Sequence, residues 1–93
     1  MKKRGETSKL VWSAQWSEKA KECLKQLDFT AQERILIKLE QAKELPYHYF
    51  ERLVGIEGWR LRVGDYRIIA KIEETTKTIR IYTVGHRKNI YKS

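Results

Sequence analysis

The sequence contains no long apolar run, a single cysteine and no cluster of metal ligands, and each absence excludes a class of protein. No apolar segment approaches the roughly 20 residues of a membrane-spanning helix, and none of signal-peptide length follows the charged start. Cys23 has no partner for an internal disulfide. His48 and His86 stand apart from other ligands, so no zinc spacing exists. We therefore expect a cytoplasmic protein with no membrane association, metal ion or other cofactor.

Positive charge, in contrast, is abundant and unevenly distributed. The 93 residues carry 20 lysines and arginines against 12 acidic residues, a formal net charge of +8. Residues 1–9 carry four basic and one acidic side chain, a net charge of +3. Residues 10–51 carry six basic and seven acidic side chains, a net charge of −1, whereas residues 52–93 carry ten basic and four acidic side chains, a net charge of +6. This asymmetry favours a polyanion or an acidic protein as partner. A generally basic, soluble surface is the alternative.

The length predicts one domain, which we assign to residues 10–93 behind a flexible basic arm of residues 1–9. Leu10–Trp12 is a candidate first strand. Two amphipathic helices follow, because apolar residues recur at helical spacing in two runs: Trp16, Ala20, Cys23, Leu24 and Leu27, then Ile35, Leu36, Leu39, Ala42 and Leu45. Thr30 and Glu33 have the spacing of a capping box at the start of the second helix, and Pro46 ends it.

From Trp59 onward the apolar period changes from helical to alternating. Three strands are predicted, at Trp59–Val63, Tyr66–Glu73 and Thr78–Val84, and a short tail follows them. The apolar run Ile68–Ala70 favours a central strand that is buried on both faces. The predicted fold is therefore a single small α+β domain: an N-terminal strand, a helical hairpin, and an antiparallel three-stranded meander with the helices packed on one sheet face.

Alternation also predicts where four arginines lie. Arg60 and Arg62 share one face of the first meander strand, Arg67 opens the next strand, and Arg87 follows the third. We expect a compact cationic patch on the sheet face that the helices leave open, and guanidinium groups suit phosphate oxygens. The alternative is a solvated face in which each arginine pairs with a carboxylate, such as Glu57, Asp65 or Glu73.

Two segments resemble the RelE family of toxins from type II toxin–antitoxin systems. Residues 59–69 look like the family's basic strand, tight turn and Tyr-Arg-hydrophobic sequence, and residues 84–91 are similar to its Gly-His/Lys-Arg…Tyr ending. The predicted order of elements from Leu10 onward matches the RelE-like fold.

The resemblance implies a metal-independent endoribonuclease that cuts messenger RNA in the ribosomal A site, with contacts to 16S rRNA, and an acidic cognate antitoxin as partner. In that reaction the ribose 2′-OH attacks the adjacent phosphate and leaves a 2′,3′-cyclic phosphate. Such a step needs a base, an acid, and cations that stabilise the charged transition state.

The resemblance also implies a role for individual residues. Arg67 matches the arginine that binds and stabilises the reacting phosphate, and Arg87 matches the C-terminal arginine that acts on the transition state or the leaving group. Tyr91 matches the terminal tyrosine that stacks on or orients the nucleotide. Lys88 is a further candidate for RNA phosphate binding.

Arg60 and Arg62 stand where well-known members have lysines. Arginine stays protonated, so we expect these two side chains to bind phosphate rather than to accept a proton. His86 is then the candidate base or acid, because an ordinary histidine titrates near neutral pH. A turn histidine with no catalytic role is its alternative, and a packing residue is the alternative for Tyr91.

Two other functions fit the same scaffold. One is a ParE-like toxin that inhibits DNA gyrase by binding, and the other is a non-catalytic basic module that binds RNA or the ribosome. The cluster of Arg67, His86, Arg87 and Tyr91 favours the endoribonuclease, because an inhibitor has no need of a phosphate-centred site.

Overall fold

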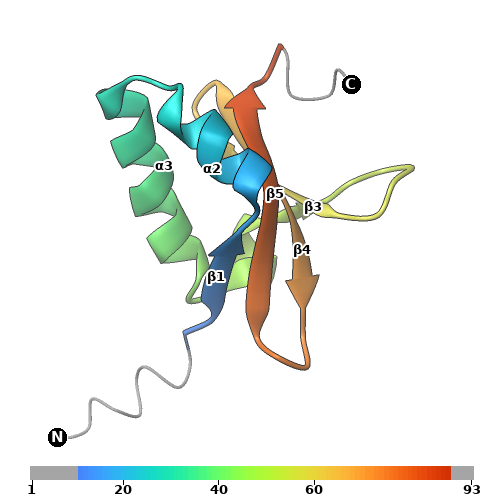
Figure 1. Ribbon diagram of the computed structural model, residues 1–93. Coiled ribbons are helices and arrows are strands. Elements are labelled where there is room, and N and C mark those ends of the chain that lie inside the picture. The colour runs from blue at the N-terminus through green and yellow to red at the C-terminus, as the bar shows by residue number, and fades with distance from the viewer. Residues whose placement is uncertain (1–10, 89–93) are drawn as a thin grey trace, which may run out of the picture.

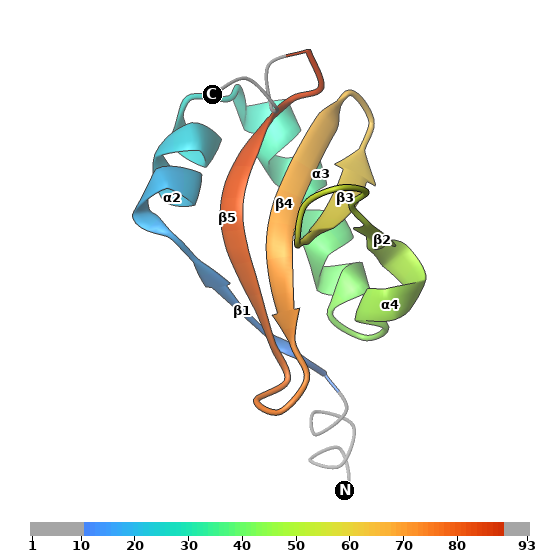
Figure 2. The ribbon, with the colours of Figure 1, turned by 90° about the vertical axis from the view of Figure 1, so that its right-hand side faces the viewer.

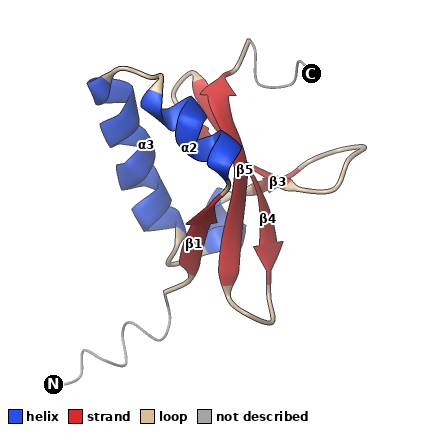
Figure 3. Cartoon of the chain, in the orientation of Figure 1, coloured by secondary structure: helices blue, strands red, loops and turns tan. Residues whose placement is uncertain are grey.

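The computed structural model describes residues 11–88, which form five strands and three helices (Figure 1, Figure 3). Their order along the chain is β1 (Ser13–Trp16), α2 (Glu18–Lys25), α3 (Phe29–Ala42), α4 (Pro46–Tyr49), β2 (Glu51–Arg52), β3 (Trp59–Val63), β4 (Tyr66–Glu73) and β5 (Thr78–His86). The predicted arm and the residues after Lys88 lie outside this description.

The strands make one sheet in the order β1-β5-β4-β3-β2, in which β1 runs parallel to β5 and the other neighbours are antiparallel. Helices α2 and α3 lie on one side of the sheet and leave its other face open (Figure 1). In the view from the open side, α3 lies behind the strands, and α4 lies next to β2 at one edge of the sheet (Figure 2). The predicted α+β domain with a β3-β4-β5 meander is therefore confirmed.

The core fills the space between α3 and the sheet. Its largest fully buried side chains are Ile35 from α3 and Leu61, Ile68, Ile79 and Ile81 from the three long strands. Strand β4 is central, as predicted, but the expected burial of both its faces is wrong. Ile68 is fully buried, whereas Ile69 points to the open face and is only partly covered.

The first strand begins later than predicted, at Ser13 rather than at Leu10, which lies outside the described residues. Pairing decides this position, because the backbone from Ser13 to Trp16 matches the edge of β5 from Thr78 onward. Trp12 instead donates its backbone N–H to the carbonyl of Lys43, 2.9 Å away, and its side chain is buried.

Both long helices start at positions that differ from the prediction. Ser17 caps α2 with its hydroxyl, so Trp16 belongs to the strand and not to the helix. Asp28 caps α3 by accepting a backbone N–H at 2.8 Å, and Thr30 is already inside the first turn. The capping box at Thr30 is therefore wrong. The carboxylate of Asp28, two residues earlier, instead accepts the exposed amide of Ala31.

The end of α3 also differs. The helix stops at Ala42, and Leu45 is 60% exposed rather than part of the apolar stripe. Pro46 does not terminate α3 but opens the short helix α4, where its fixed φ suits the first helical position. The two-residue strand β2 that follows was not predicted.

A β-bulge in β5 decides which way the end of this strand faces. Ile69 pairs with Thr83 but Ala70 pairs with Ile81, so Tyr82 is an extra residue. Ser17 stabilises the bulge: its hydroxyl donates to the Tyr82 carbonyl at 2.8 Å. Residues beyond the bulge consequently change face, since an inserted residue reverses the alternation. Strand β5 also extends to His86, two residues further than predicted.

Candidate functional site

Arg60 and Arg62 lie on the open face of β3. Between and after them, Leu61 and Val63 are 1% and 8% exposed and face the helices. Because successive side chains of a strand point to opposite sides, the two arginines are directed away from the core. With Arg67 and Arg87 they form what we call the arginine face.

Arg67 lies directly across from Arg62 in the β3–β4 pairing. One of its guanidinium nitrogens, Nη1, donates to the carbonyl oxygens of Gly64 and Tyr66, both at 3.0 Å. These bonds hold the guanidinium over the turn between the strands. No described carboxylate forms a salt bridge with Arg67, although two arginines directly opposite each other repel. An anion bound between them would relieve this repulsion.

Arg87 reaches the same turn from the end of β5. Its backbone N–H donates to the Asp65 carbonyl at 2.7 Å, and its Nε lies 3.9 Å from the Asp65 carboxylate. Gly85 pairs with Arg67, and Arg87 lies in the turn after β5, two residues beyond that pair. The turn at Gly64 and Asp65 thus brings together two arginines that are 20 positions apart in the sequence.

Glu51 on β2 is a member of this face that the sequence did not reveal. It pairs with Arg60 across the sheet, and its Oε1 accepts a 2.8 Å hydrogen bond from Arg60 Nη2. Arg62 Nε lies 3.7 Å from the same oxygen. The hydrogen bond from Arg60, followed by the charges of Arg62 and Arg67, lowers the pKa of Glu51 below its ordinary value. Glu51 is therefore an ionised carboxylate among the arginines.

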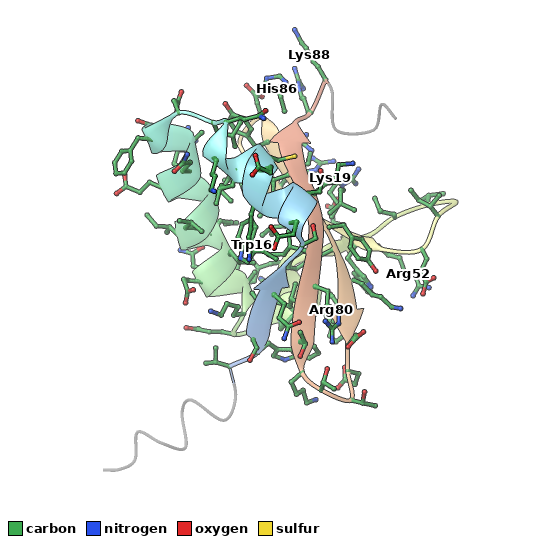
Figure 4. The ribbon with its side chains drawn as sticks, in the orientation of Figure 1. Trp16, Lys19, Arg52, Arg80, His86 and Lys88 are labelled. Atoms are coloured by element: carbon green, nitrogen blue, oxygen red, sulfur yellow. The ribbon has the colours of Figure 1, made fainter. Side chains whose placement is uncertain are left out.

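Arg80 and Lys71 extend the basic face toward β1. They lie opposite each other on β5 and β4. Arg80 is occupied: its Nε lies 2.9 Å from the Glu73 carboxylate, and its Nη1 donates to the side-chain oxygen of Gln15 at 2.7 Å (Figure 4). The bond from Arg80 also lowers the pKa of Glu73. The alternative to an anion site, pairing of each arginine with a carboxylate, is met by Arg60 and Arg62 through Glu51 and by Arg87 through Asp65, as it is by Arg80. Among residues 11–88 it is not met by Arg67.

His86 lies on the other side of the sheet. It pairs with Tyr66, which in turn pairs with the buried Val63, so all three belong to the helix-covered face. The His86 and Tyr66 rings pack edge to face with centroids 5.6 Å apart. Its Nδ1 accepts the backbone N–H of Lys88 at 3.2 Å, at the end of β5 (Figure 4). The structure therefore does not bring His86 together with the arginines.

The remaining predicted residues are less informative. Lys88 is exposed, and Tyr91 lies outside the described residues. Within residues 11–88, no group of three histidine, cysteine, aspartate or glutamate side chains is placed to hold a metal ion, and no helix is long and apolar enough to span a bilayer. The chemistry available on the arginine face is thus that of guanidiniums and of the carboxylates of Glu51 and Asp65.

Comparison with solved structures finds the same fold in toxins of RelBE systems. The toxin–antitoxin complex RelBE2 of Mycobacterium tuberculosis matches with a TM-score of 0.74 and 18% identity, over 83% of this chain and 99% of that one. The RelE–RelB complex of Pyrococcus horikoshii matches with a TM-score of 0.70 and 20% identity, over 85% and 98%. The RelB–RelE complex of Methanococcus jannaschii matches with 0.66 and 24%, over 84% and 95%. Identities this low show the fold alone.

No protein of curated function matches the sequence. The family comparison is decisive, because residues 14–91 match the family described as ParE toxin of type II toxin–antitoxin system, parDE. The match covers nearly the whole described chain and includes every strand and helix except the first residue of β1. The chain therefore belongs to the ParE toxin family, within the RelE/ParE superfamily, and is the toxin of a toxin–antitoxin pair.

Proposed function

We propose that this toxin is an endoribonuclease that cleaves messenger RNA in the ribosomal A site without a metal ion. In the proposed reaction the ribose 2′-oxygen attacks the neighbouring phosphorus and the bond to the 5′-oxygen breaks. The products are a 2′,3′-cyclic phosphate and a 5′-hydroxyl. A base accepts the 2′-OH proton, an acid supplies a proton to the leaving oxygen, and cations stabilise the added negative charge.

The placement of Arg62, Arg67 and Arg87 around one turn is the observation that carries the proposal. Arg62 and Arg67 are directly opposite, and Arg67 and Arg87 are both bonded to the Gly64–Asp65 turn. A phosphate bound here would meet several planar donors at once, the arrangement in which arginine binds phosphate most strongly. Arg60 lies next to them and completes the cationic surface.

Glu51 is our candidate for the proton acceptor. Its carboxylate is on the arginine face and ionised at neutral pH, so it can accept a proton, although the hydrogen bond from Arg60 lowers its pKa and makes it a weaker base. His86 faces the other side of the sheet from the arginine face, and its role as base or acid stays a prediction. The contributions of Lys88 and Tyr91 stay predictions.

The partner that would restrain this activity is an acidic cognate antitoxin. When the toxin binds in the ribosomal A site, it would also contact 16S rRNA. The net charge of +8 favours acidic and polyanionic partners. The similar toxins of M. tuberculosis and P. horikoshii were solved in complexes with their antitoxins, which supports the same kind of partner here.

The direct test uses the full chain with ribosomes programmed by a defined messenger RNA. We expect cleavage within the A-site codon and upstream fragments that end in a 2′,3′-cyclic phosphate. If no codon is cut, or if the fragments end in a plain 3′-hydroxyl, the proposed reaction is wrong.

Inhibition of DNA gyrase is the second candidate function, because the matching family is named for ParE. A gyrase supercoiling assay with the purified chain separates the two. Inhibition of supercoiling that persists in Arg67→Ala, together with an absence of RNA cleavage, would favour the gyrase function over the endoribonuclease.

A further inference from the structure

The loop between β2 and β3, residues 53–58, carries apolar side chains that point into solvent. Val54 is 97% exposed, more than any other large apolar side chain among residues 11–88, and Ile56 is 62% exposed. The loop extends away from the helices on the open side of the sheet (Figure 1), and in the view onto that face it lies in front of the strands, next to β4 (Figure 2). Residues 54–56, which we call the loop tip, therefore stand on the same side of the sheet as the arginine face.

The loop is anchored at its base. Leu53 donates its backbone N–H to the Gly58 carbonyl at 3.0 Å, and this bond closes the loop above the β2–β3 pair. Gly58 has a φ of +140°, and a Cβ placed there would lie 3.3 Å from Leu53 Cδ1, so the close approach favours glycine. In the pair below, the guanidinium carbon of Arg52 lies 5.6 Å from the centre of the Trp59 ring. A Cβ placed at Gly55, in contrast, would meet no described atom within 4 Å beyond its chain neighbours, so the tip itself is unpacked.

The size and the charges of the loop fit a nucleobase as the group that covers its tip. Two aliphatic side chains are too few for a stable protein interface, which buries about 800 Å² on each partner. They are enough to cover one base, and aliphatic wedges between bases are common in nucleic-acid-binding proteins. Arg60 in β3 and the exposed Arg52 at the base of the loop (Figure 4) can bind phosphates, whereas the exposed Glu57 beside the tip repels them. An RNA strand whose phosphates follow the arginines would therefore present its uncharged bases to the tip.

We propose that the loop tip is a wedge, in which Val54 and Ile56 enter between two neighbouring bases of the bound RNA and hold them apart. The phosphate that joins those two nucleotides would lie on the arginine face. The choice of RNA as the ligand rests on the proposed function. The separation of the bases is nevertheless a property of binding, so it can be measured whether or not the RNA is cut.

Separating the bases would assist the proposed reaction. In a stacked strand the ribose 2′-oxygen lies to one side of the bond between phosphorus and the leaving 5′-oxygen, so it cannot attack in line with that bond. Once the two bases no longer stack, the ribose and the phosphate between them can rotate until the three atoms are in line. The loop makes and breaks no bond. Val54 and Ile56 are thus positioning residues, and the charge of the transition state is left to the arginines.

The test measures stacking with 2-aminopurine, an adenine analogue whose fluorescence is quenched when it stacks. The probe is placed between two adenines in a single-stranded RNA, and these positions carry 2′-deoxy sugars so that no cleavage can occur. We expect the full chain at saturation to raise the fluorescence at least about threefold, because an inserted side chain unstacks the probe. The double variant Val54→Ser with Ile56→Ser should bind the RNA within about threefold of the native affinity, since the arginines are unchanged, yet leave the fluorescence low.

Two control variants separate the wedge from a general loss of apolar surface. Phe29→Ser with Leu36→Ser removes two side chains of α3 that are 75% and 43% exposed, on the side of the sheet away from the tip, and should unstack the probe as the native chain does. Val54→Leu with Ile56→Leu keeps the tip apolar and should restore the rise in fluorescence. All four side chains are exposed, so each variant is expected to fold, and urea unfolding checks this.

A second readout uses cleavage on programmed ribosomes. At saturation the serine double variant should cleave at least about tenfold more slowly than the native chain, with little change in the concentration that gives half the maximal rate. The loss should be larger for an A-site codon with adjacent purines than for one with adjacent pyrimidines, because purines stack more strongly. An equal loss for both codons would contradict the wedge.

The outcomes distinguish this proposal from the endoribonuclease itself. If the native chain raises the fluorescence of neither the free RNA nor the same probe in a ribosomal A site, or if the rise survives in the serine double variant, the wedge is overturned. A chain that unstacks the RNA without cutting it would support the wedge and refute the endoribonuclease, and a chain that cuts without unstacking would do the reverse. If the serine variant unstacks RNA as the native chain does but loses a self-association that the native chain shows in ultracentrifugation, the tip is a protein contact and the proposal is wrong.

Discussion

Replacing Arg67 with alanine should separate catalysis from folding more clearly than any other single change. The substitution removes a guanidinium that lies opposite Arg62 and is held by two carbonyl oxygens at 3.0 Å. These bonds are partly exposed to solvent, so we expect their loss to lower the free energy of unfolding by about 1 kcal/mol. A domain of this size then remains folded.

The expected effect on cleavage is larger. A preorganised charge at the reacting phosphate contributes about a hundredfold to a thousandfold to the rate, or about 3–4 kcal/mol in activation free energy. That exceeds the loss of stability, so unfolding could not explain it. Arg67→Lys keeps the charge but loses the planar fork that bonds to Gly64 and Tyr66, and should fall between native and alanine.

The assay is single-turnover cleavage of messenger RNA on saturating programmed ribosomes, with urea unfolding measured in parallel. Arg80→Ala is the matched control, because Arg80 lies on the same sheet face but is already paired with Glu73 and Gln15. Cleavage by Arg67→Ala within about threefold of the native rate would refute the phosphate-binding role. An equal loss in Arg80→Ala would show that only the total charge matters.

Three further outcomes follow from the structure. Glu51→Gln should bind RNA at least as tightly as the native chain, since a competing carboxylate is gone, yet cleave at least about a hundredfold more slowly in single-turnover assays; equal cleavage rates would remove Glu51 as the base. Ile68→Ala should cost about 2–5 kcal/mol in urea unfolding because the side chain is fully buried, whereas Ile69→Ala on the open face should cost less. The pKa of Glu74 is lowered, chiefly by its hydrogen bonds from Lys77 and Tyr47, so its contribution to stability is present above its ordinary value of 4.5 and is lost as the pH falls below it. Thermal unfolding across that range should show a shallower decline in Glu74→Gln.

The endoribonuclease and gyrase proposals share one scaffold, and fold similarity cannot choose between them. The sequence resembles RelE at the arginine motifs, the matching family is described as ParE, and the three solved complexes described above are of RelBE systems, at 24% identity or below. Function on a common scaffold is decided by the site. The proposal of an endoribonuclease therefore rests on the site, where Arg62, Arg67 and Arg87 lie around one turn, and not on the similarity of the fold.

Local sequence patterns were sufficient wherever neighbours along the chain decide the structure. The bounds of β3 and β4 were predicted correctly, because strict alternation and a Gly64-Asp65 turn specify a hairpin without help from distant residues. The pairing of Arg62 with Arg67 follows from the same short turn. The predicted starts of the two long helices were wrong by one or two residues, because several polar side chains near each end could serve as the cap.

Distant pairings were beyond the reach of the sequence. Strand β1 was misplaced because its position depends on β5, some 65 residues away. Glu51 was missed for the same reason: β2 has only two residues, no periodicity can be seen in it, and its strand character comes from pairing with β3. Without β2, nothing in the sequence places a carboxylate between Arg60 and Arg62.

The sequence by itself determined a small basic α+β domain, the β3–β4 hairpin and a row of arginines on the face away from the helices. Only the tertiary structure decided which C-terminal residues join that row. The extra residue Tyr82 reverses the alternation of β5, so that Val84 and His86 turn toward the helices while Gly85 lies opposite Arg67 and leads into Arg87. The bulge lies where β4, β5 and the capping residue Ser17 meet. Because it depends on contacts among three separate segments, no local pattern in the sequence predicts it.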